Sequence, residues 1–292
     1  KALQILQRLA TQSTAASAPE LLDELSDAAV KVLRSKPEMG IVFSSLNRFL
    51  LDSEQFETAS DVGELRIQAV ARLQDQVRRM EADLAQSAEH ASTLVQNGDV
   101  VLTYSRSSTV VAALKRAKAA GKTFDVVTAE SRPNLEGRTI AKELSEDQIP
   151  VRFVVDAMLG SVVEGADRVM VGADAITPRS FVNKVGTRLL VMAAKARGIP
   201  VHVISDTGKA WVKRTDPMVS LLGGKIRDPK EVWDQPPYGV EIVNLYFEET
   251  PLEWCSGIVS EVGEQRPAEF WSNVRSVGYS RRIRRAFGDE LL

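Results

Sequence analysis

Residues 168–187 read Arg-Val-Met-Val-Gly-Ala-Asp-Ala-Ile-Thr-Pro-Arg-Ser-Phe-Val-Asn-Lys-Val-Gly-Thr. The apolar run from Val169 to Val171 predicts a buried strand, and Asp174 follows just past its carboxyl end. A polar loop then leads to Asn183 and Lys184, which we expect at the start of a helix. In open parallel sheets, ligands bind at the edge formed by the carboxyl ends of the strands. The segment therefore predicts an α/β fold and a candidate site at that edge.

The chemistry of these three side chains fits a sugar-phosphate site. A carboxylate such as Asp174 can exchange a proton, an amide such as Asn183 can hold a hydroxyl, and an ammonium such as Lys184 can hold a phosphate. The alternative is an ordinary loop, with Asp174 as a helix cap and Lys184 in solvent.

Strand-like and helical segments alternate around this stretch, from residue 97 onward. The strand-like segments are short and apolar, and Gly or Pro residues separate the elements. We expect strands at 99–103, 124–128, 151–156, 168–172 and 201–205, and helices at 110–120, 138–146, 160–165 and 184–198. This order predicts a Rossmann-like, doubly wound and mostly parallel sheet.

The first part of the chain reads as helical. Apolar residues recur there at steps of three and four, at Val70, Leu73, Val77, Met80 and Leu84. Such a stripe is typical of a long amphipathic helix, either on the inner face of a helical subdomain or at the seam of a dimer. We predict a helical amino-terminal subdomain at 1–96 and a Rossmann-like ligand-binding domain at 97–292.

The composition limits the classes of function. The chain has 292 residues, of which 44% are hydrophobic, and its formal net charge is −2, so we expect no general binding to nucleic acid or to anionic lipid. We also expect no membrane span and a cytoplasmic location, because no apolar run is long enough for a bilayer. Cys255 is the one cysteine, and only two histidines are present, so we expect neither a disulfide nor a metal site.

Two further polar loops are predicted at the same edge. The first, residues 103–108, contains Ser105, Arg106 and Ser107; Arg106 and the amides can hold an anion, and the serines fit equally well as helix caps. The second, residues 128–138, contains Arg132, whose guanidinium can hold a phosphate through two hydrogen bonds.

Other familiar chemistries find little support. No Gly-x-Gly-x-x-Gly follows the first predicted strand, which argues against a dinucleotide cofactor. Neither histidine lies in one of the polar loops, which argues against a Ser-His-Asp hydrolase.

Five motifs in chain order resemble one family: Leu-Thr-Tyr-Ser-Arg-Ser-Ser (102–108), Thr-Ala-Glu-Ser-Arg-Pro-Asn-Leu-Glu-Gly (128–137), Val-Val-Asp-Ala (154–157), Val-Gly-Ala-Asp (171–174) and Asn-Lys-Val-Gly-Thr (183–187). This family contains ribose-1,5-bisphosphate isomerase, methylthioribose-1-phosphate isomerase, and the alpha, beta and delta regulatory subunits of the exchange factor for translation initiation factor 2. The resemblance also includes Val-Asn-Leu-Tyr-Phe-Glu-Glu-Thr-Pro (243–251).

The resemblance implies a helical amino-terminal part, a Rossmann-like part, and a homodimer or higher homo-oligomer. The family's isomerases convert a phosphorylated aldose to a ketose and need no metal or organic cofactor. By resemblance, Asp174 matches their acid/base aspartate, Asn183 and Lys184 match the pair that holds substrate, and Arg132 matches the arginine of a Thr-Glu-x-Arg-Pro loop.

One departure from the family concerns the cysteine that its isomerases carry after the first strand. Ser105 stands in its place here, and a hydroxyl is a much weaker acid than a thiol. Ser105 is therefore a poor substitute unless a neighbouring group activates it.

Two functions remain open on the sequence. The first is a sugar-phosphate aldose–ketose isomerase, with Asp174 as acid/base, Ser105 as a weak second relay or hydrogen-bond donor, and a substrate held by Arg106, Ser107, Arg132, Asn183 and Lys184. The second is a catalytically silent relative that binds a sugar phosphate or a nucleotide as a regulatory subunit. The missing cysteine favours the second, and the retained Asp174, Asn183 and Lys184 favour the first.

Overall fold

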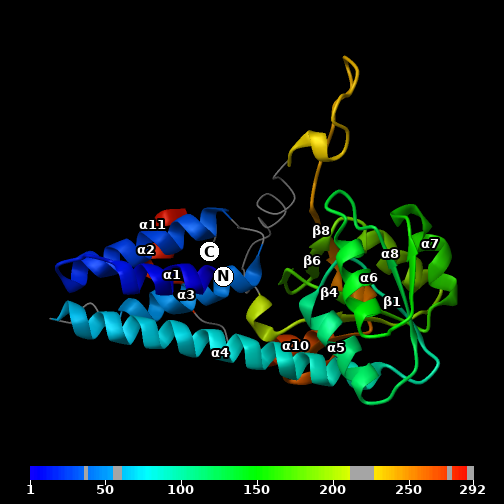
Figure 1. Ribbon diagram of the computed structural model, residues 1–292, viewed down its shortest axis with the longest axis horizontal. Coiled ribbons are helices and arrows are strands. Elements are labelled where there is room, and N and C mark those ends of the chain that lie inside the picture. Colours follow the sequence, from blue (N-terminus) through cyan, green and yellow to red (C-terminus); the bar gives the residue numbers. More distant parts are fainter. Residues whose placement is uncertain (36–38, 55–60, 211–226, 275–277, 288–292) are drawn as a thin grey trace. The chain divides into compact units, whose positions relative to one another are not determined.

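A computed structural model describes residues 1–35, 39–54, 61–210, 227–274 and 278–287 (Figure 1). These residues form two compact units. The described parts of Lys1–Ala82, Gly208–Pro217 and Arg275–Leu292 make up the first, and those of Asp83–Thr207 and Met218–Val274 make up the second. The first unit thus includes Ala82 and also contains the carboxyl-terminal helix.

Helices build the first unit, and each buries one apolar face. They are α1 (Ala2–Gln12), α2 (Ala18–Ser35), α3 (Gly40–Glu54), the part of α4 (Val62–Leu94) up to Ala82, and α11 (Arg281–Phe287). Leucines spaced by three or four positions form the core between them, since residues at that spacing share one side of a helix. Leu6, Leu21, Leu25, Leu46 and Leu50 have no exposed surface.

The long amphipathic pattern lies in α4, as expected. Leu73 is fully buried, whereas Val70 and Met80 are only half-buried. The buried side of this part of the helix runs instead through Leu65, Ala69 and Leu73. The helix is therefore confirmed, and its buried stripe is rotated slightly from the predicted one.

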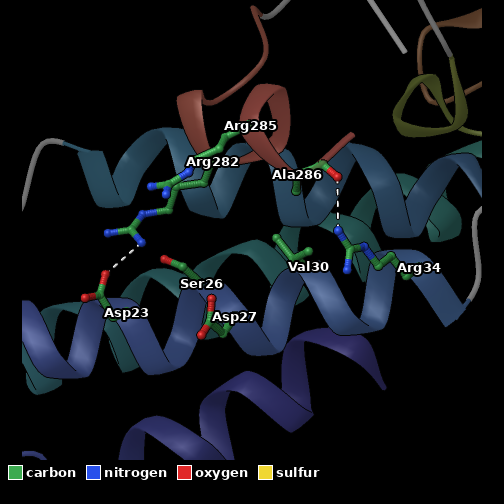
Figure 2. A pocket seen from close by; sticks show the side chains of 8 residues that line it. All are labelled: Asp23, Ser26, Asp27, Val30, Arg34, Arg282, Arg285 and Ala286. Atoms are coloured by element: carbon green, nitrogen blue, oxygen red, sulfur yellow. Dashed lines mark hydrogen bonds and ion pairs between the residues drawn. The ribbon is translucent and has the colours of Figure 1, made fainter. Parts of the chain in front are cut away.

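The basic segment near the carboxyl end forms α11, which packs on α2 and α3. Arg282 Nη1 lies 2.8 Å from Asp23 Oδ1. A cavity of about 490 Å³ lies beside this ion pair (Figure 2). Its lining residues are Asp23, Ser26, Asp27, Val30, Arg34, Arg282, Arg285 and Ala286. Both signs of charge are present, so the cavity has no strong preference for an anion or a cation.

A seven-stranded sheet forms the centre of the described part of the second unit, in the order β10-β9-β7-β4-β1-β2-β3. Every pairing is parallel except that of β10 with β9. The strands are β1 (Val100–Leu102), β2 (Asp125–Ala129), β3 (Val151–Val154), β4 (Arg168–Gly172), β7 (Val201–Ile204), β9 (Gly257–Ser260) and β10 (Gly263–Gln265). Each of the five strands predicted from the sequence is confirmed.

Helices precede, connect and follow these strands. They are the end of α4, α5 (Ser108–Ala119), α6 (Glu136–Glu146), α7 (Leu159–Val162), α8 (Thr187–Ala196) and α10 (Pro267–Asn273). One core cluster joins Ala91 of α4, Leu114 of α5 and Leu144 of α6 to Met170 of β4. Helix α8 contacts β4 and β7 without contributing to that cluster, so it covers the opposite face. The predicted doubly wound α/β architecture is confirmed.

The segment between Asp174 and the next helix differs from the predicted loop. It forms a hairpin of β5 (Ala175–Ile176) and β6 (Ser180–Lys184), and β6 pairs antiparallel with β8 (Phe247–Pro251) in a second, three-stranded sheet. Asn183 and Lys184 therefore lie at the end of a strand, and the helix begins only at Thr187. The strand forms because β8, more than 60 positions away, supplies its backbone partners.

Short 3-10 turns complete the described chain: η1 (Asp156–Met158), η2 (Val163–Gly165), η3 (Thr207–Lys209), η4 (Pro229–Glu231) and η5 (Leu252–Trp254). Among the described helices, none is long and apolar enough to cross a membrane.

Candidate functional site

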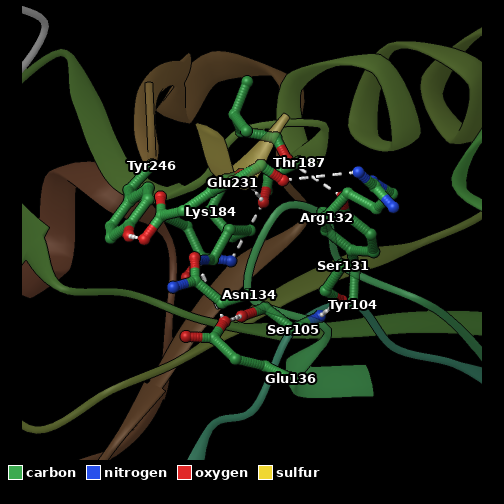
Figure 3. Close-up of polar contacts among 12 residues, drawn as sticks. Tyr104, Ser105, Ser131, Arg132, Asn134, Glu136, Lys184, Thr187, Glu231 and Tyr246 are labelled. Atoms are coloured by element: carbon green, nitrogen blue, oxygen red, sulfur yellow. Dashed lines mark hydrogen bonds and ion pairs between the residues drawn. The ribbon is translucent and has the colours of Figure 1, made fainter. Parts of the chain in front are cut away.

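The candidate site lies in the second unit, where the loops after β1 and β2 meet the end of β6. Because neighbouring parallel strands end at one edge of the sheet, their loops gather there. Figure 3 shows Ser105, Asn134, Glu136 and Lys184 directed toward one another. These side chains come from three segments: Ser105 lies 31 positions before Glu136, and Asn134 lies 50 positions before Lys184.

Ser105, in the loop after β1, is buried and held in a left-handed backbone conformation with φ of 62°. Its backbone N–H donates to Ser131 Oγ at 2.9 Å, and its hydroxyl donates to Glu136 Oε2 at 2.6 Å. Both of its donors are therefore committed to the loop after β2.

Ser107 and Arg106, two residues expected to hold phosphate, are bound to other protein groups. Ser107 caps α5, with its Oγ accepting from the Val110 N–H at 3.4 Å. The Arg106 guanidinium forms two hydrogen bonds with the carboxylate of Glu143 on α6, at 2.8 and 3.2 Å. A phosphate would have to compete with Glu143 for Arg106.

The loop after β2 is fixed by Asp156. Its two carboxylate oxygens accept from the N–H groups of Ser131 and Arg132, at 2.7 and 2.8 Å. The side chain of Arg132 contacts a different segment of the chain: its Nη2 lies 3.5 Å from the carbonyl oxygen of Glu231. Asp156 stands in the 154–157 motif of the sequence, and its role here is to position the loop that carries Arg132.

Lys184 is the most deeply buried charged side chain of the site, with 2% of its surface exposed. Its Nζ donates to Asn134 Oδ1 at 3.0 Å and lies 3.1 Å from Glu136 Oε2. The rings of Tyr246 and Phe247 lie 4.9 and 5.5 Å from the same nitrogen. A buried ammonium loses its hydration, and these four groups replace it.

Asn183 faces away from Lys184, because successive residues of a strand point to opposite faces. Its amide nitrogen donates to Thr187 Oγ1 at 3.0 Å, at the start of α8. The two residues that we expected to act as a pair thus occupy different environments.

Asp174 lies two residues beyond β4, at the entry of the hairpin. Its backbone N–H donates to the carbonyl of Val182 at 2.7 Å. The paired part of the hairpin begins one residue later, with Ala175 opposite Val182, so Asp174 lies just outside the ladder and next to its first pair. Lys184, at the far end of β6, is grouped with the loop after β2.

Tyr104, in the loop after β1, links that loop to the residues that follow β6. Its hydroxyl donates to the carbonyl of Val185 at 2.9 Å, next to Gly186, where φ is +102° and a Cβ atom would lie 2.6 Å from the tyrosine oxygen. Burial, and secondarily the nearby carboxylate of Asp156, raises the pKa of Tyr104. The phenol therefore stays protonated and serves as a donor to the backbone.

Several site residues were not selected from the sequence, although some belonged to the quoted motifs. Asn134 and Glu136 stand in the 128–137 motif and Tyr246 in the 243–251 motif. Their contacts with the buried ammonium of Lys184 distinguish these three residues from the other residues of the two motifs. Burial also raises the pKa of Tyr246, whose hydroxyl bonds to Glu231.

Cys255 is the one cysteine of the sequence, and it is not among the residues of this site. Cys255 is half-buried, and burial raises the pKa of its thiol to about 12. In the part of the chain that the structure describes, no three His, Cys, Asp or Glu side chains are grouped to hold a metal ion.

The chain was compared with known families and proteins. The model of the "Initiation factor 2 subunit family" matches residues 1–267. A Pyrococcus furiosus protein named as similar to subunit 2 of translation initiation factor eIF-2B is 34% identical over 195 residues, which are 66% of this chain and 67% of that protein. Ribose 1,5-bisphosphate isomerase of Thermococcus kodakarensis is 28% identical over 266 residues, 88% of this chain and 82% of that enzyme.

Solved structures agree with these sequence relationships. The crystal structure of Pyrococcus horikoshii translation initiation factor eIF-2B superposes with a TM-score of 0.77 at 28% identity, covering 94% of this chain and 90% of that one.

Proposed function

The chain belongs to the Initiation factor 2 subunit family, and we propose that it is a sugar-phosphate aldose–ketose isomerase similar to ribose 1,5-bisphosphate isomerase. Several relatives that match more than four fifths of this chain carry that enzyme's name. The observation that most supports the proposal is the burial of Lys184 beside Ser105 and Glu136, at the sheet edge to which Asp174 also belongs. Buried polar groups of this kind are typical of sites that hold charged ligands.

In this proposal, Asp174 moves the proton. Asp174 gives a proton to the ring oxygen O4 as the C1–O4 bond breaks, which leaves C1 electron-poor and makes the hydrogen on C2 acidic. The carboxylate of Asp174 then removes that hydrogen as a proton and returns it to C1. Asn183, near the end of β6, orients a sugar hydroxyl. No metal or organic cofactor is required for this chemistry.

The phosphate groups of the substrate are assigned to Lys184, Arg132, Arg106 and Ser107. The Arg132 guanidinium has a long hydrogen bond, 3.5 Å, to the neutral carbonyl of Glu231. A phosphate can therefore bind Arg132 more easily than it can bind the two cations that are paired with carboxylates. Lys184 and Arg106 are paired with Glu136 and Glu143, and phosphate would compete with those carboxylates. We also propose a homodimer or higher homo-oligomer located in the cytoplasm.

A catalytically silent binding protein is the second candidate. It is favoured by the internal pairing of Lys184 and Arg106, since cations that are already neutralised hold a structure together without any ligand. The replacement of the family cysteine by Ser105 favours it as well. Such a protein would bind a phosphorylated sugar or a nucleotide and act as a regulatory subunit.

Conversion of ribose 1,5-bisphosphate, followed by NMR, tests the isomerase. We expect the ketose to form with the unmodified protein and the rate to fall about 10²- to 10⁴-fold in Asp174→Asn, since a positioned acid/base contributes a factor of that size. Asp125→Asn is the matched control, because Asp125 is exposed at the opposite end of β2.

The outcomes separate the two candidates. Turnover that survives Asp174→Asn would remove Asp174 from its proposed role. Saturable binding of the sugar phosphate without ketose formation would establish the silent binding protein in place of the enzyme.

A further inference from the structure

The hydrogen bonds of Ser105 determine how it can meet a ligand. A hydroxyl has one proton and two lone pairs. The proton is given to Glu136 Oε2 at 2.6 Å, and the backbone N–H of Ser105 is given to Ser131. Ser105 therefore offers a ligand only acceptor positions. It suits a sugar hydroxyl and does not suit the oxygen atoms of a phosphate, which accept hydrogen bonds.

Glu136 is held in place on both sides. The oxygen that accepts from Ser105 is also the one 3.1 Å from the ammonium of Lys184. Glu136 is the first residue of α6, and Gly137 allows that helix to begin directly against β2: a Cβ atom there would lie 1.6 Å from the carbonyl oxygen of Ala129. The carboxylate thus has a fixed position, an attached proton donor and a neighbouring positive charge.

We propose that Ser105 and Glu136 form a proton relay that receives the proton of the sugar's 2-hydroxyl during isomerisation; this rests on the proposed isomerase function. The O2–H bond breaks as its proton moves to Ser105 Oγ. The original Ser105 O–H bond breaks at the same time, and that proton moves to Glu136 Oε2. The electron pair left on O2 forms the C2 carbonyl of the ketose as the C1=C2 double bond of the enol takes up the proton carried by Asp174. When the product leaves, Glu136 gives its proton to water and Asp174 takes one from water, so both carboxyl groups return to their starting states.

The relay gives the two carboxylates separate tasks. Asp174 handles the hydrogen on carbon, and Glu136 acts through Ser105 on the hydrogen on oxygen. It also removes the difficulty raised by the missing cysteine, because a serine beside a carboxylate can pass on a proton without itself being acidic. Ser105 is the catalytic residue of the pair, and Glu136 is its positioning residue.

Kinetics of three variants test the relay. We expect Ser105→Ala and Glu136→Gln each to lower kcat about 10²-fold. The KM is expected to change by less than about threefold in Glu136→Gln and to rise about tenfold in Ser105→Ala, which also loses the hydroxyl contact. The double variant is expected to be no slower than either single variant, because the two residues act as one unit. Glu146→Gln, which makes the same charge change at an exposed position of α6, is expected to match the unmodified protein.

Binding of ribose 1,5-bisphosphate and of its 2-deoxy analogue to the slow Asp174→Asn variant tests the same contact with little turnover. By calorimetry, Asp174→Asn is expected to bind the 2-deoxy sugar about tenfold more weakly than the ribose compound, and the addition of Ser105→Ala is expected to remove that difference. Ser105→Ala keeps the Glu136–Lys184 pair, so it serves if Glu136→Gln alters the fold.

Each result has a definite meaning. Turnover with unchanged kcat in Ser105→Ala, or multiplicative losses in the double variant, would overturn the relay and leave the isomerase standing. A Ser105-dependent preference for the 2-hydroxyl, together with no turnover by the unmodified protein, would overturn the isomerase and the proton transfer, and would leave the hydroxyl contact alone. Equal affinity of Asp174→Asn for the two sugars would overturn the contact itself.

Discussion

The Lys184–Glu136 pair at the sheet edge and the Arg282–Asp23 pair beside the helical cavity have similar geometry and different surroundings (Figures 2 and 3). Their nitrogen–oxygen distances are 3.1 and 2.8 Å. The exposed fractions of the side chains are 2% and 37% for Lys184 and Glu136, and 32% and 68% for Arg282 and Asp23. The shorter ion pair is therefore the more hydrated one. Distance alone does not show which pair matters, because the strength of an ion pair depends on how much water surrounds it.

Burial changes what the protein must supply around the charge. Lys184 needs Asn134 and two aromatic rings in addition to its carboxylate partner, whereas water solvates most of Asp23 and part of Arg282. The positions of all these partners are fixed around the one ammonium group of Lys184. Because the helical cavity has no such buried and fully surrounded charge among its lining residues, we place the candidate site at the sheet edge.

The largest effect is expected from breaking the buried pair. Lys184→Met keeps the length of the side chain and removes its charge, and we expect the free energy of unfolding to fall by about 2 kcal/mol. Glu136 is partly exposed and can recover some hydration, which keeps the loss below that of a fully buried pair. Urea denaturation followed by circular dichroism measures it.

A double-mutant cycle isolates the interaction between the two side chains. Lys184→Met is expected to cost much less in a Glu136→Gln background, with a coupling free energy above about 1 kcal/mol. Equal costs in both backgrounds would show that Lys184 stabilises the fold through packing alone.

An intermediate effect is expected for His202, whose ring is buried while its partner Glu264 is about half exposed. Burial lowers the pKa of His202 from its ordinary value of 6.5, although Glu264 opposes the shift; Arg168 adds to it. The unfolded chain therefore binds more protons than the folded one just below pH 6.5. Stability is fully present above pH 6.5 and is lost as the pH falls through the lowered pKa.

Urea denaturation between pH 5 and pH 8 measures this dependence. His202→Gln is expected to flatten the curve in the range just below pH 6.5. A curve of unchanged shape in His202→Gln would assign the pH dependence to other groups.

The smallest effect is expected at the surface pair. The cycle of Asp23→Asn and Arg282→Met is expected to give a coupling free energy below about 0.5 kcal/mol, and to lose it in 1 M salt, where exposed charges are screened. The same salt should leave most of the Lys184–Glu136 coupling in place. Equal coupling at the two pairs would remove burial as the explanation of the difference.

Sequence patterns were sufficient for the main sheet. The short apolar segments at residues 124–128 and 168–172 are strands because alternating helices shield both faces of a parallel sheet, so nearly every strand residue is buried. The same patterns were insufficient at Asn183 and Lys184. Those residues join a strand through β8, and no local signal near residue 183 indicates a partner at residue 248.

The candidate site was partly visible in the same way. The sequence predicts the loops that follow the strands, and Ser105 and Lys184 are among the candidate site residues that it indicates there. Glu136 is not, because a glutamate at the start of a helix has the ordinary role of meeting the positive end of the helix dipole. Only its contacts with Ser105 and Lys184 distinguish it from such a residue.

The order of apolar and polar residues, a local property, was enough to establish a doubly wound sheet and the edge where its loops gather. The choice of partner for each polar side chain came from the fold in three dimensions. Arg106 pairs with Glu143, and Lys184 pairs with Glu136 and Asn134, through contacts between segments distant in the sequence. Hydrophobic burial acts on each segment according to its own periodicity, whereas a hydrogen bond or an ion pair depends on ångström-scale distances that exist only once the chain has folded.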